Sequence, residues 1–255
     1  MGKNMKCLLS FGIWRPTLRR LPTRGAVALT FDDGPSPETT PRLLDQLAAA
    51  KAKATFFVSG VRAVANRDLV AAMIEGGHAV YGHGWEHVHL EYDPQRAVDD
   101  MRRVEDELSR LRPTPPVYLL RLPYNAGYAR AAMHQAMAAF HPNFQFACWS
   151  HSTFDYRIAE CCRSPGDLPI LCRAAADALR RSRDLDGGIV LMHEKSFGGP
   201  PPLNAEVAPV LLPMVLEVLA QRGLRSVTLP PLEAVRPLYR WILPTMSRLP
   251  DPFAG

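Results

Sequence analysis

Residues 26–35 read AVALTFDDGP, an apolar run that ends in two adjacent carboxylates and a Gly-Pro turn. An apolar run without alternation predicts a strand that is buried on both faces, as in a parallel sheet. Asp32 and Asp33 then stand at the carboxyl end of this strand, where α/β barrels and open α/β sheets place their active sites. Taken alone, the stretch is also compatible with a plain turn in which Asp side chains bond nearby backbone groups.

Similar apolar runs recur along the chain, and amphipathic segments separate them. The predicted strands cover residues 26–31, 54–58, 78–81, 117–122, 144–149, 188–192 and 224–229. The predicted helices cover residues 41–50, 67–75, 94–111, 129–140, 166–183 and 205–222. Helices that alternate with strands in this way predict an α/β fold with a parallel sheet, either doubly wound or closed into a barrel.

Composition and length indicate one packed domain. The 255 residues are 47% hydrophobic and 22% charged, which is ordinary globular usage and excludes a disordered, collagenous or coiled-coil chain. We expect an N-terminal leader segment at 1–24, a catalytic domain at 25–230 and a proline-rich tail at 231–255.

The net charge indicates which partners to expect, and the cysteine content indicates the compartment. The net charge of +5 comes from scattered basic residues, so no nucleic-acid partner is expected. The longest stretch without Asp, Glu, Lys or Arg, residues 131–154, contains many polar groups, and no transmembrane span is expected. Five cysteines without paired spacing favour a cytoplasmic protein, with a periplasmic or membrane-associated location as the alternatives. The oligomeric state stays open.

Polar side chains follow other predicted strands as well. His83 and His87 come after the third strand at a spacing of four, so one helical turn would place them on the same side. Two such histidines and a carboxylate from elsewhere supply three protein ligands to a metal. Arg121 lies at the end of the fourth predicted strand, one residue before its last, and His193 follows the sixth, so we expect these groups to converge on one rim.

On these residues the chain resembles the polysaccharide deacetylase family, also called the NodB homology domain or carbohydrate esterase family 4. The resemblance covers roughly residues 26–229. The family's first motif, Thr-Phe-Asp-Asp-Gly, stands unchanged at 30–34. Its second motif, two histidines that enclose a hydroxyl residue and two variable ones, matches 83–87 except that glycine replaces the hydroxyl residue. The third, Arg-x-Pro-Tyr, lies at 121–124, and the fifth, Leu-x-His, at 191–193.

The fourth motif matches only in part. The family reads Asp-x-x-Asp-Trp after a strand-five tryptophan, whereas here Ser152 follows Trp149 at the first Asp position and Asp155 keeps the second. Without this carboxylate, the pKa of His193 is expected to be lower, so that the imidazole holds its proton less well near neutral pH, unless Asp155 or His151 compensates.

The resemblance implies a distorted (β/α) barrel with seven or eight mainly parallel strands and a bound divalent metal. Zinc is the expected ion, with cobalt or nickel as alternatives. Asp33, His83 and His87 are the implied ligands. The metal polarises the amide carbonyl and lowers the pKa of the attacking water from about 15.7 toward about 7.

The resemblance also assigns roles to the remaining side chains. Asp32 is the implied general base, Arg121 holds Asp32 in place and keeps it ionised, and His193 is the implied acid that protonates the leaving amine. A backbone N–H near Tyr124 is expected to stabilise the tetrahedral oxyanion.

Four further side chains are expected in or near the substrate site. Tyr124 and Trp149 are expected to line it, together with Asp155. For Trp85 the sequence leaves two positions open, one lining the site and one packed in the core.

The resemblance predicts a metal-dependent hydrolase that removes N-acetyl groups from an amino-sugar-containing polysaccharide or oligosaccharide. One alternative keeps the chemistry and changes the substrate to a formamide, a small amide or an O-acetyl ester. The other alternative is a carbohydrate-binding pseudoenzyme. Asp32 and His193 favour catalysis, because a pure binder needs neither a base nor an acid.

Overall fold

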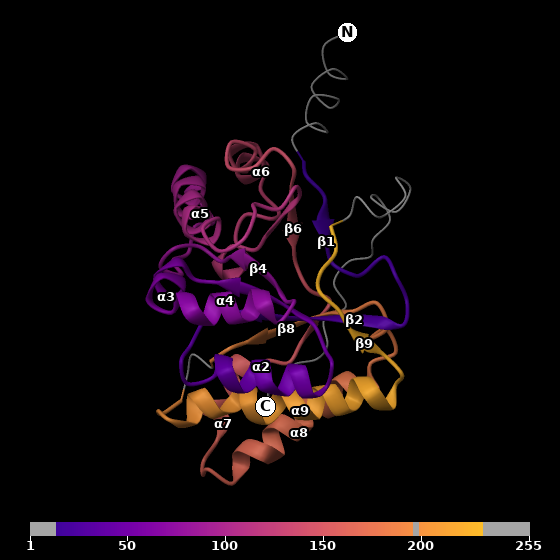
Figure 1. Ribbon diagram of the computed structural model, residues 1–255. Helices are drawn as coiled ribbons and strands as arrows, with labels where there is room; N and C mark the ends of the chain where they lie inside the picture. Colours follow the sequence, from indigo (N-terminus) through magenta and orange to yellow (C-terminus); the bar gives the residue numbers. More distant parts are fainter. Residues whose placement is uncertain (1–13, 196–198, 232–255) are drawn as a thin grey trace.

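Strand β2 (Ala26–Asp32) runs through the middle of the larger sheet, and all of its residues are buried. The computed structural model describes residues 14–195 and 199–231, so the predicted tail beyond residue 231 lies outside the described part (Figure 1). The larger sheet has the order β4-β3-β2-β8-β7, with β9 also paired to β2. All of these pairs are parallel. The other strands of this sheet are β3 (Ala54–Val58), β4 (Ala79–Gly82), β7 (His151–Ser152), β8 (Ile189–His193) and β9 (Arg225–Ser226).

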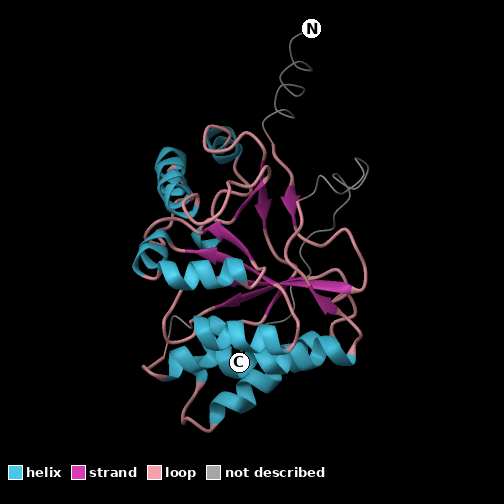
Figure 2. Ribbon diagram, in the orientation of Figure 1, coloured by secondary structure: helices cyan, strands magenta, loops and turns pink. Residues whose placement is uncertain are grey.

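A second, smaller sheet completes the barrel. It contains β1 (Thr17–Leu18), β6 (Phe144–Ala147) and β5 (Tyr118–Leu120), again in parallel pairs. Strands β4 and β5 lie side by side, and the Gly82 N–H donates to the Tyr118 hydroxyl at 2.9 Å instead of to a strand partner. The described strands therefore form a distorted barrel of two sheets, as expected (Figure 2).

Helices cover the outside of the barrel. Helices α2, α8 and α9 pack on one side of β2 and β8, while α5 and α6 lie on the other side of the barrel (Figure 1). The helix bounds are α2 (Thr40–Ala49), α3 (Gly60–Ala65), α4 (Arg67–Glu75), α5 (Pro94–Leu108), α6 (Ala131–Met137), α7 (Asp155–Cys161), α8 (Asp167–Arg181) and α9 (Leu203–Gln221), with a short 3-10 helix η1 (Pro123–Asn125).

Alternation along β2 explains how the strand serves both the core and the site. Val27, Leu29 and Phe31 belong to the hydrophobic cluster under α2, α8 and α9. Because successive side chains point to opposite faces of a strand, Thr30 and Asp32 face the barrel interior. The position of Asp32 in the strand therefore aims its carboxylate inward.

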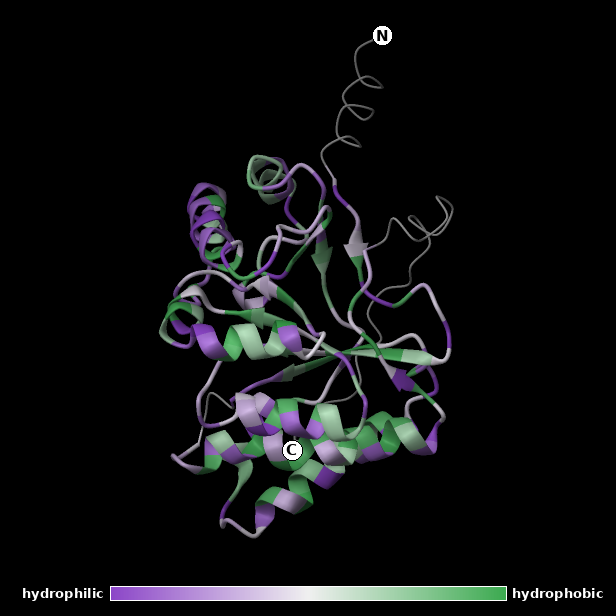
Figure 3. Ribbon diagram, viewed as in Figure 1, coloured by the Kyte–Doolittle hydropathy of each residue, from purple (hydrophilic) through white to green (hydrophobic). Residues whose placement is uncertain are grey.

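Helix α9 is long and apolar enough to cross a membrane by length and composition. Half of its apolar window is nevertheless buried inside the domain, where α9 packs against α8, α7 and α2. Figure 3 shows α9 as mainly hydrophobic along its length, in contrast to the more hydrophilic α5. In this structure α9 is a core helix.

Each predicted strand and helix has a counterpart, although several are shorter than predicted. The predicted strand at 117–122 keeps regular pairing only over β5. The structure adds the short elements β1, β7, α3 and α7. The described end of the predicted leader contains β1, which pairs with β6, and Leu18 is fully buried. The leader prediction therefore excluded residues that belong to the barrel, because so short a strand leaves no apolar run to detect.

Candidate active site

Two adjacent carboxylates occupy the carboxyl end of β2. Asp32 is the last residue of the strand, and Asp33 begins the following turn with a φ of 73°. Both side chains are buried. A non-glycine residue in left-handed backbone is strained and persists only where its surroundings hold it. The Asp33 N–H donates to the Phe57 carbonyl at 3.0 Å, and Arg62 Nη1 donates to the Asp33 carbonyl at 2.7 Å.

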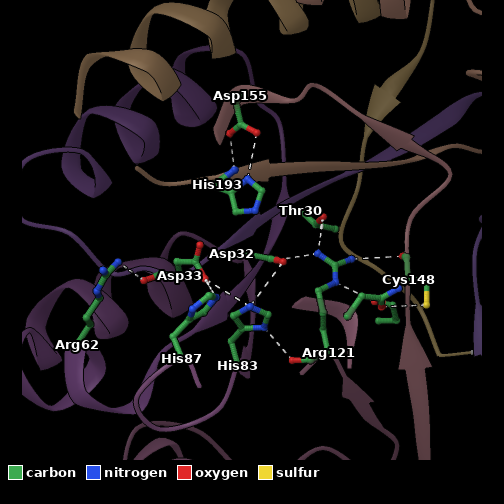
Figure 4. Close-up of polar contacts among 12 residues, drawn as sticks. Thr30, Asp32, Asp33, Arg62, His83, His87, Arg121, Cys148, Asp155 and His193 are labelled. Carbon is green, nitrogen blue, oxygen red and sulfur yellow. Dashed lines mark hydrogen bonds and ion pairs between the residues drawn. The ribbon is translucent and has the colours of Figure 1, made fainter. Parts of the chain in front are cut away.

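The two histidines lie in the irregular segment that follows β4. This segment is not helical, so the prediction that one helical turn brings His83 and His87 together is wrong. Left-handed backbone at Gly84, with a φ of 77°, and at His87, with a φ of 57°, folds the loop back instead. His83 Nε2 lies 3.4 Å from Asp33 Oδ1 and His87 Nε2 lies 2.9 Å from the same oxygen (Figure 4).

The donor set of Asp33, His83 and His87 fits a divalent metal ion. Each residue offers one ligand atom, and the atoms lie within 4.8 Å of one another. His83 Nδ1 lies 2.8 Å from the Arg121 carbonyl oxygen, which only accepts, so we assign the ring proton to Nδ1. The Nε2 lone pair of a neutral His83 then faces a carboxylate, an arrangement that a cation between them stabilises. Two imidazoles and one carboxylate suit zinc and similar ions.

The charges of Asp33 and the two histidines also favour a bound metal ion. Burial alone opposes the ionisation of Asp33, but the imidazoles of His83 and His87 outweigh it and hold the pKa of Asp33 well below its usual range. Burial likewise opposes protonation of His83, whereas Asp32 and Asp33 raise the pKa of this imidazole. Neither Asp33 carboxylate oxygen accepts a hydrogen bond of normal geometry from the described residues. Buried charge of this kind is usually paired or bound to a metal.

Arg121 reaches Asp32 from the barrel interior and holds its carboxylate. Arg121 Nη1 lies 2.7 Å from Asp32 Oδ1, and the Arg121 side chain is fully buried. The guanidinium also donates to Thr30 Oγ1 at 2.9 Å and to the Ala147 carbonyl at 2.8 Å. The ring of Phe57 lies 4.2 Å from the guanidinium carbon. A buried arginine with these partners fixes one oxygen of Asp32, while the other lies on the side of His83 (Figure 4).

His193 ends β8 on the other side of the metal ligands and pairs with Asp155. His193 Nδ1 lies 3.0 Å from Asp155 Oδ1, and the His193 backbone N–H donates to Asp155 Oδ2 at 2.6 Å. Burial lowers the affinity of His193 for a proton, but Asp155, helped by Asp33 and Asp32, outweighs it and raises the pKa of His193 to about 9. Nearby Tyr156 packs its ring edge-on against His193, with 5.6 Å between ring centroids.

Asp155, and not His151, is therefore the residue that pairs with His193 and compensates for the carboxylate missing from the fourth motif. Ser152 lies in β7, and its hydroxyl accepts from the Phe154 N–H at 3.1 Å. His151 is fully buried in a different cluster, where Nε2 lies 3.2 Å from Asp184 Oδ1. Although Ser152 replaces the first aspartate of the motif, His193 keeps a carboxylate partner in Asp155.

The three predicted aromatic residues take different positions. Tyr124 is 64% exposed, and its ring lies 4.9 Å from that of His87, centroid to centroid. Trp149 is half-buried, with its ring 5.5 Å from the Arg121 guanidinium. Trp85 is buried in the main hydrophobic cluster, and Arg103 stacks on it at 3.7 Å. Tyr124 and Trp149 therefore border the group of site residues, while Trp85 packs the core beneath.

Sequence reasoning missed two residues that contact this group. Arg62 on α3 reaches the Asp33 carbonyl, but the helix and its arginine carry no recognisable motif. Glu194 directly follows His193 and is fully buried, and burial raises the pKa of its carboxyl to about 8. The adjacency to His193 was the available signal for Glu194.

A barrel of parallel strands with ionisable side chains gathered at their carboxyl ends is typical of an enzyme. Comparison with known proteins makes this assignment specific. The family model described as "Polysaccharide deacetylase" matches residues 20–141. The chain belongs to the polysaccharide deacetylase family.

The chain is similar to a chitooligosaccharide deacetylase of Sinorhizobium fredii, with 32% identity over 60% of this chain and 76% of the relative. It is also 33% identical to a peptidoglycan-N-acetylglucosamine deacetylase, PgdA, of Listeria monocytogenes over 70% of this chain. The chain spans 34% of the length of that Listeria relative. Among solved structures, the chitin deacetylase of Colletotrichum lindemuthianum superposes with a TM-score of 0.67 at 26% identity, covering 83% of this chain and 88% of the other.

Proposed function

We propose that this protein is a metal-dependent hydrolase that removes N-acetyl groups from an amino-sugar-containing polysaccharide or oligosaccharide. The observation that carries the proposal is the grouping of a carboxylate held by an arginine, an imidazole paired with a carboxylate, and three residues that could hold a metal ion at one end of the barrel. The names of the relatives, which act on chitooligosaccharide, peptidoglycan and chitin, support a glycan as substrate.

Asp33, His83 and His87 hold the metal in this proposal, and zinc is the expected ion. A divalent metal bound there supplies Lewis acidity to the amide carbonyl and to the attacking water. His83 keeps its ring orientation through the Arg121 carbonyl, at 2.8 Å from Nδ1. Such an outer contact fixes the ring tautomer of a metal-binding histidine.

Asp32 acts as the general base in the proposed reaction. Arg121 takes one oxygen of this carboxylate, at 2.7 Å, and leaves the other to accept a proton from water. His83 Nε2 lies 3.9 Å from that second oxygen, Asp32 Oδ2, so the base stands beside the proposed metal ligands. A positioned base of this kind contributes roughly 100- to 10,000-fold to the rate.

His193 acts as the general acid. Asp155 holds the imidazole through Nδ1, at 3.0 Å, and Nε2 is the atom proposed to donate a proton to the leaving amine nitrogen. A backbone N–H near Tyr124 is the proposed donor to the oxyanion that forms on the acetyl carbonyl. Water attacks the acetyl carbon, the C–N bond breaks, and the products are acetate and the free amine.

Acetate release from N-acetylglucosamine oligomers tests the proposal. The purified protein is stripped of metal with a chelator, and zinc, cobalt or nickel is then restored. We expect release only with metal present. Release from a formamide or an O-acetyl ester, but from no N-acetylated glycan, would favour the substrate alternative. Metal and sugar binding without any acyl release would favour the carbohydrate-binding pseudoenzyme.

A further inference from the structure

Glu194 is a buried acid that the proposed reaction does not use. It follows His193, and none of its surface is exposed. One carboxylate oxygen, Oε1, has no hydrogen-bond partner among the described residues. A buried carboxyl group with an unsatisfied oxygen is costly, so its presence beside the site indicates a role that offsets the cost.

The Glu194 side chain turns back over the loop that follows β2. A methyl group added to Gly34 would lie only 1.6 Å from Glu194 Oε1, so the carboxyl group fills the space that the missing Cβ of Gly34 leaves. Glu194 Oε2 accepts a hydrogen bond from the Thr40 hydroxyl in the first turn of α2. The Ser36 N–H donates to the same hydroxyl at 2.8 Å. The side chain thus contacts both ends of the turn between β2 and α2.

This turn is the one that presents Asp33. Gly34 follows Asp33 directly, and the Gly34 carbonyl accepts from the Ser59 N–H at 2.9 Å. Glu194 also donates its own backbone N–H to the Asp32 carbonyl at 3.1 Å. The left-handed backbone of Asp33 needs such contacts on both sides, because this conformation is unfavourable without them.

We propose that Glu194 is a positioning residue that holds the turn after β2, and so aims the Asp33 carboxylate at His83 and His87. The inference rests on the proposed function, since it concerns how a proposed metal ligand is held. It also gives a reason for glycine at position 34, where any side chain would meet the Glu194 carboxyl group.

Metal affinity measured against a chromophoric chelator tests the inference. We expect Glu194→Ala to bind zinc and cobalt about 10- to 100-fold more weakly, the range found for residues that hold metal ligands. Gly34→Ala disturbs the same contact from the other side and should weaken binding similarly. In the double variant the methyl group introduced at position 34 enters the space that the Glu194 carboxyl group vacates. The affinity of the double variant should therefore lie closer to wild type than that of either single variant.

Two further variants control for general loss of stability. Glu105 on α5 is another buried acid, and its Oε1 lies 2.9 Å from Arg112 Nη1. Glu105→Ala should lower the unfolding midpoint and leave metal affinity unchanged. If Glu194→Ala does not fold, Thr40→Val removes the hydroxyl that Glu194 contacts while keeping the side-chain size. It should weaken metal binding in the same direction.

The outcomes separate this inference from the proposed function. All affinities are measured at a temperature where each variant is folded, which removes a purely structural effect. Wild-type affinity in folded Glu194→Ala, or in Thr40→Val if it replaces that variant, would overturn the positioning role, even while the wild-type protein binds metal and releases acetate. A wild-type protein that binds no divalent metal would overturn the proposed function, and the positioning role with it.

Discussion

Asp32 and His193 each lie beside a partner of opposite charge. Arg121, fully buried, lies beside the carboxylate of Asp32, whereas Asp155 lies beside the imidazole of His193. A carboxylate next to an imidazole favours the protonated form of the imidazole. In the proposed reaction Arg121 orients the base Asp32, and Asp155 favours the proton that His193 gives to the leaving amine.

The His193 pair predicts a measurable pKa in the metal-free protein. Burial opposes protonation, but Asp155 leads the charges that raise the pKa of His193 to about 9. Asp155→Asn removes the largest of these charges, so we expect the imidazole to titrate at a lower pH. Nuclear magnetic resonance of the His193 ring against pH measures the shift directly.

The same substitution predicts a change in the pH–rate profile. Above its pKa the imidazole has lost the proton that it donates, so the rate falls as pH rises through that value. In Asp155→Asn this fall should begin at a lower pH than in the wild-type protein. As a control, Asp177→Asn alters an exposed ion pair on α8 and should leave the profile unchanged. Identical alkaline limbs in Asp155→Asn and wild type would show that Asp155 does not set the proton affinity of His193.

At the scale of elements, the loop after β4 brings its two histidines together without a helix. Gly84 adopts a φ of 77°, a conformation that side chains with a Cβ rarely take. A Cβ at this position would also lie 3.2 Å from Cγ of Pro123 in η1. The left-handed backbone at this position therefore favours glycine over the hydroxyl residue of the family motif.

This bend predicts that restoring the family's hydroxyl costs stability. Gly84→Ser places a side chain in left-handed backbone, at a cost of about 1–2 kcal/mol. Urea unfolding measures the cost as a lower midpoint at constant slope. Gly223 has a φ of 64° and open space around its Cα, so Gly223→Ser is the matched control that carries the backbone strain without the Pro123 contact. A Gly84→Ser protein as stable as wild type would contradict the left-handed conformation.

How much the sequence predicts differs between elements. Strand β2 and its two carboxylates follow directly from residues 26–35, because an apolar run and its polar end need no tertiary information. The approach of His87 to Asp33 depends on a loop whose left-handed bends leave no periodic pattern. The pairing of Asp155 with His193 joins elements far apart in the chain, so only the motif suggested it. Strand β1 is too short for any pattern to reveal.

For the whole molecule, the barrel brings the carboxyl ends of separate strands to one end. Asp32 ends β2 and Asp33 follows it, His83 follows β4, and His193 ends β8. Hydrophobic clusters on both faces of β2 hold these strands in register. A metal held by Asp33 and the two histidines, as proposed, would link the turn after β2 to the loop after β4.

This link predicts that metal removal lowers thermal stability. A ligand that binds only the folded state at 100 times its dissociation constant stabilises it by about 2.7 kcal/mol. For a domain of this size we expect the melting temperature to fall by roughly 5 to 10 °C on chelation. Scanning calorimetry before and after chelation measures the change. His87→Ala removes a partly exposed side chain of the proposed ligand set and should abolish most of the metal-dependent shift. Equal melting temperatures with and without saturating zinc would contradict the link.

The most direct test of the proposed reaction separates the base from the metal. Asp32→Asn keeps the size of the side chain and removes its ability to accept a proton, while Asp33, His83 and His87 stay in place. Acetate release from N-acetylglucosamine oligomers is measured together with zinc affinity in the folded variant. We predict that release falls roughly 100- to 10,000-fold while zinc affinity stays near wild type. Undiminished acetate release from Asp32→Asn would contradict the assignment of Asp32 as the base of a metal-dependent deacetylase.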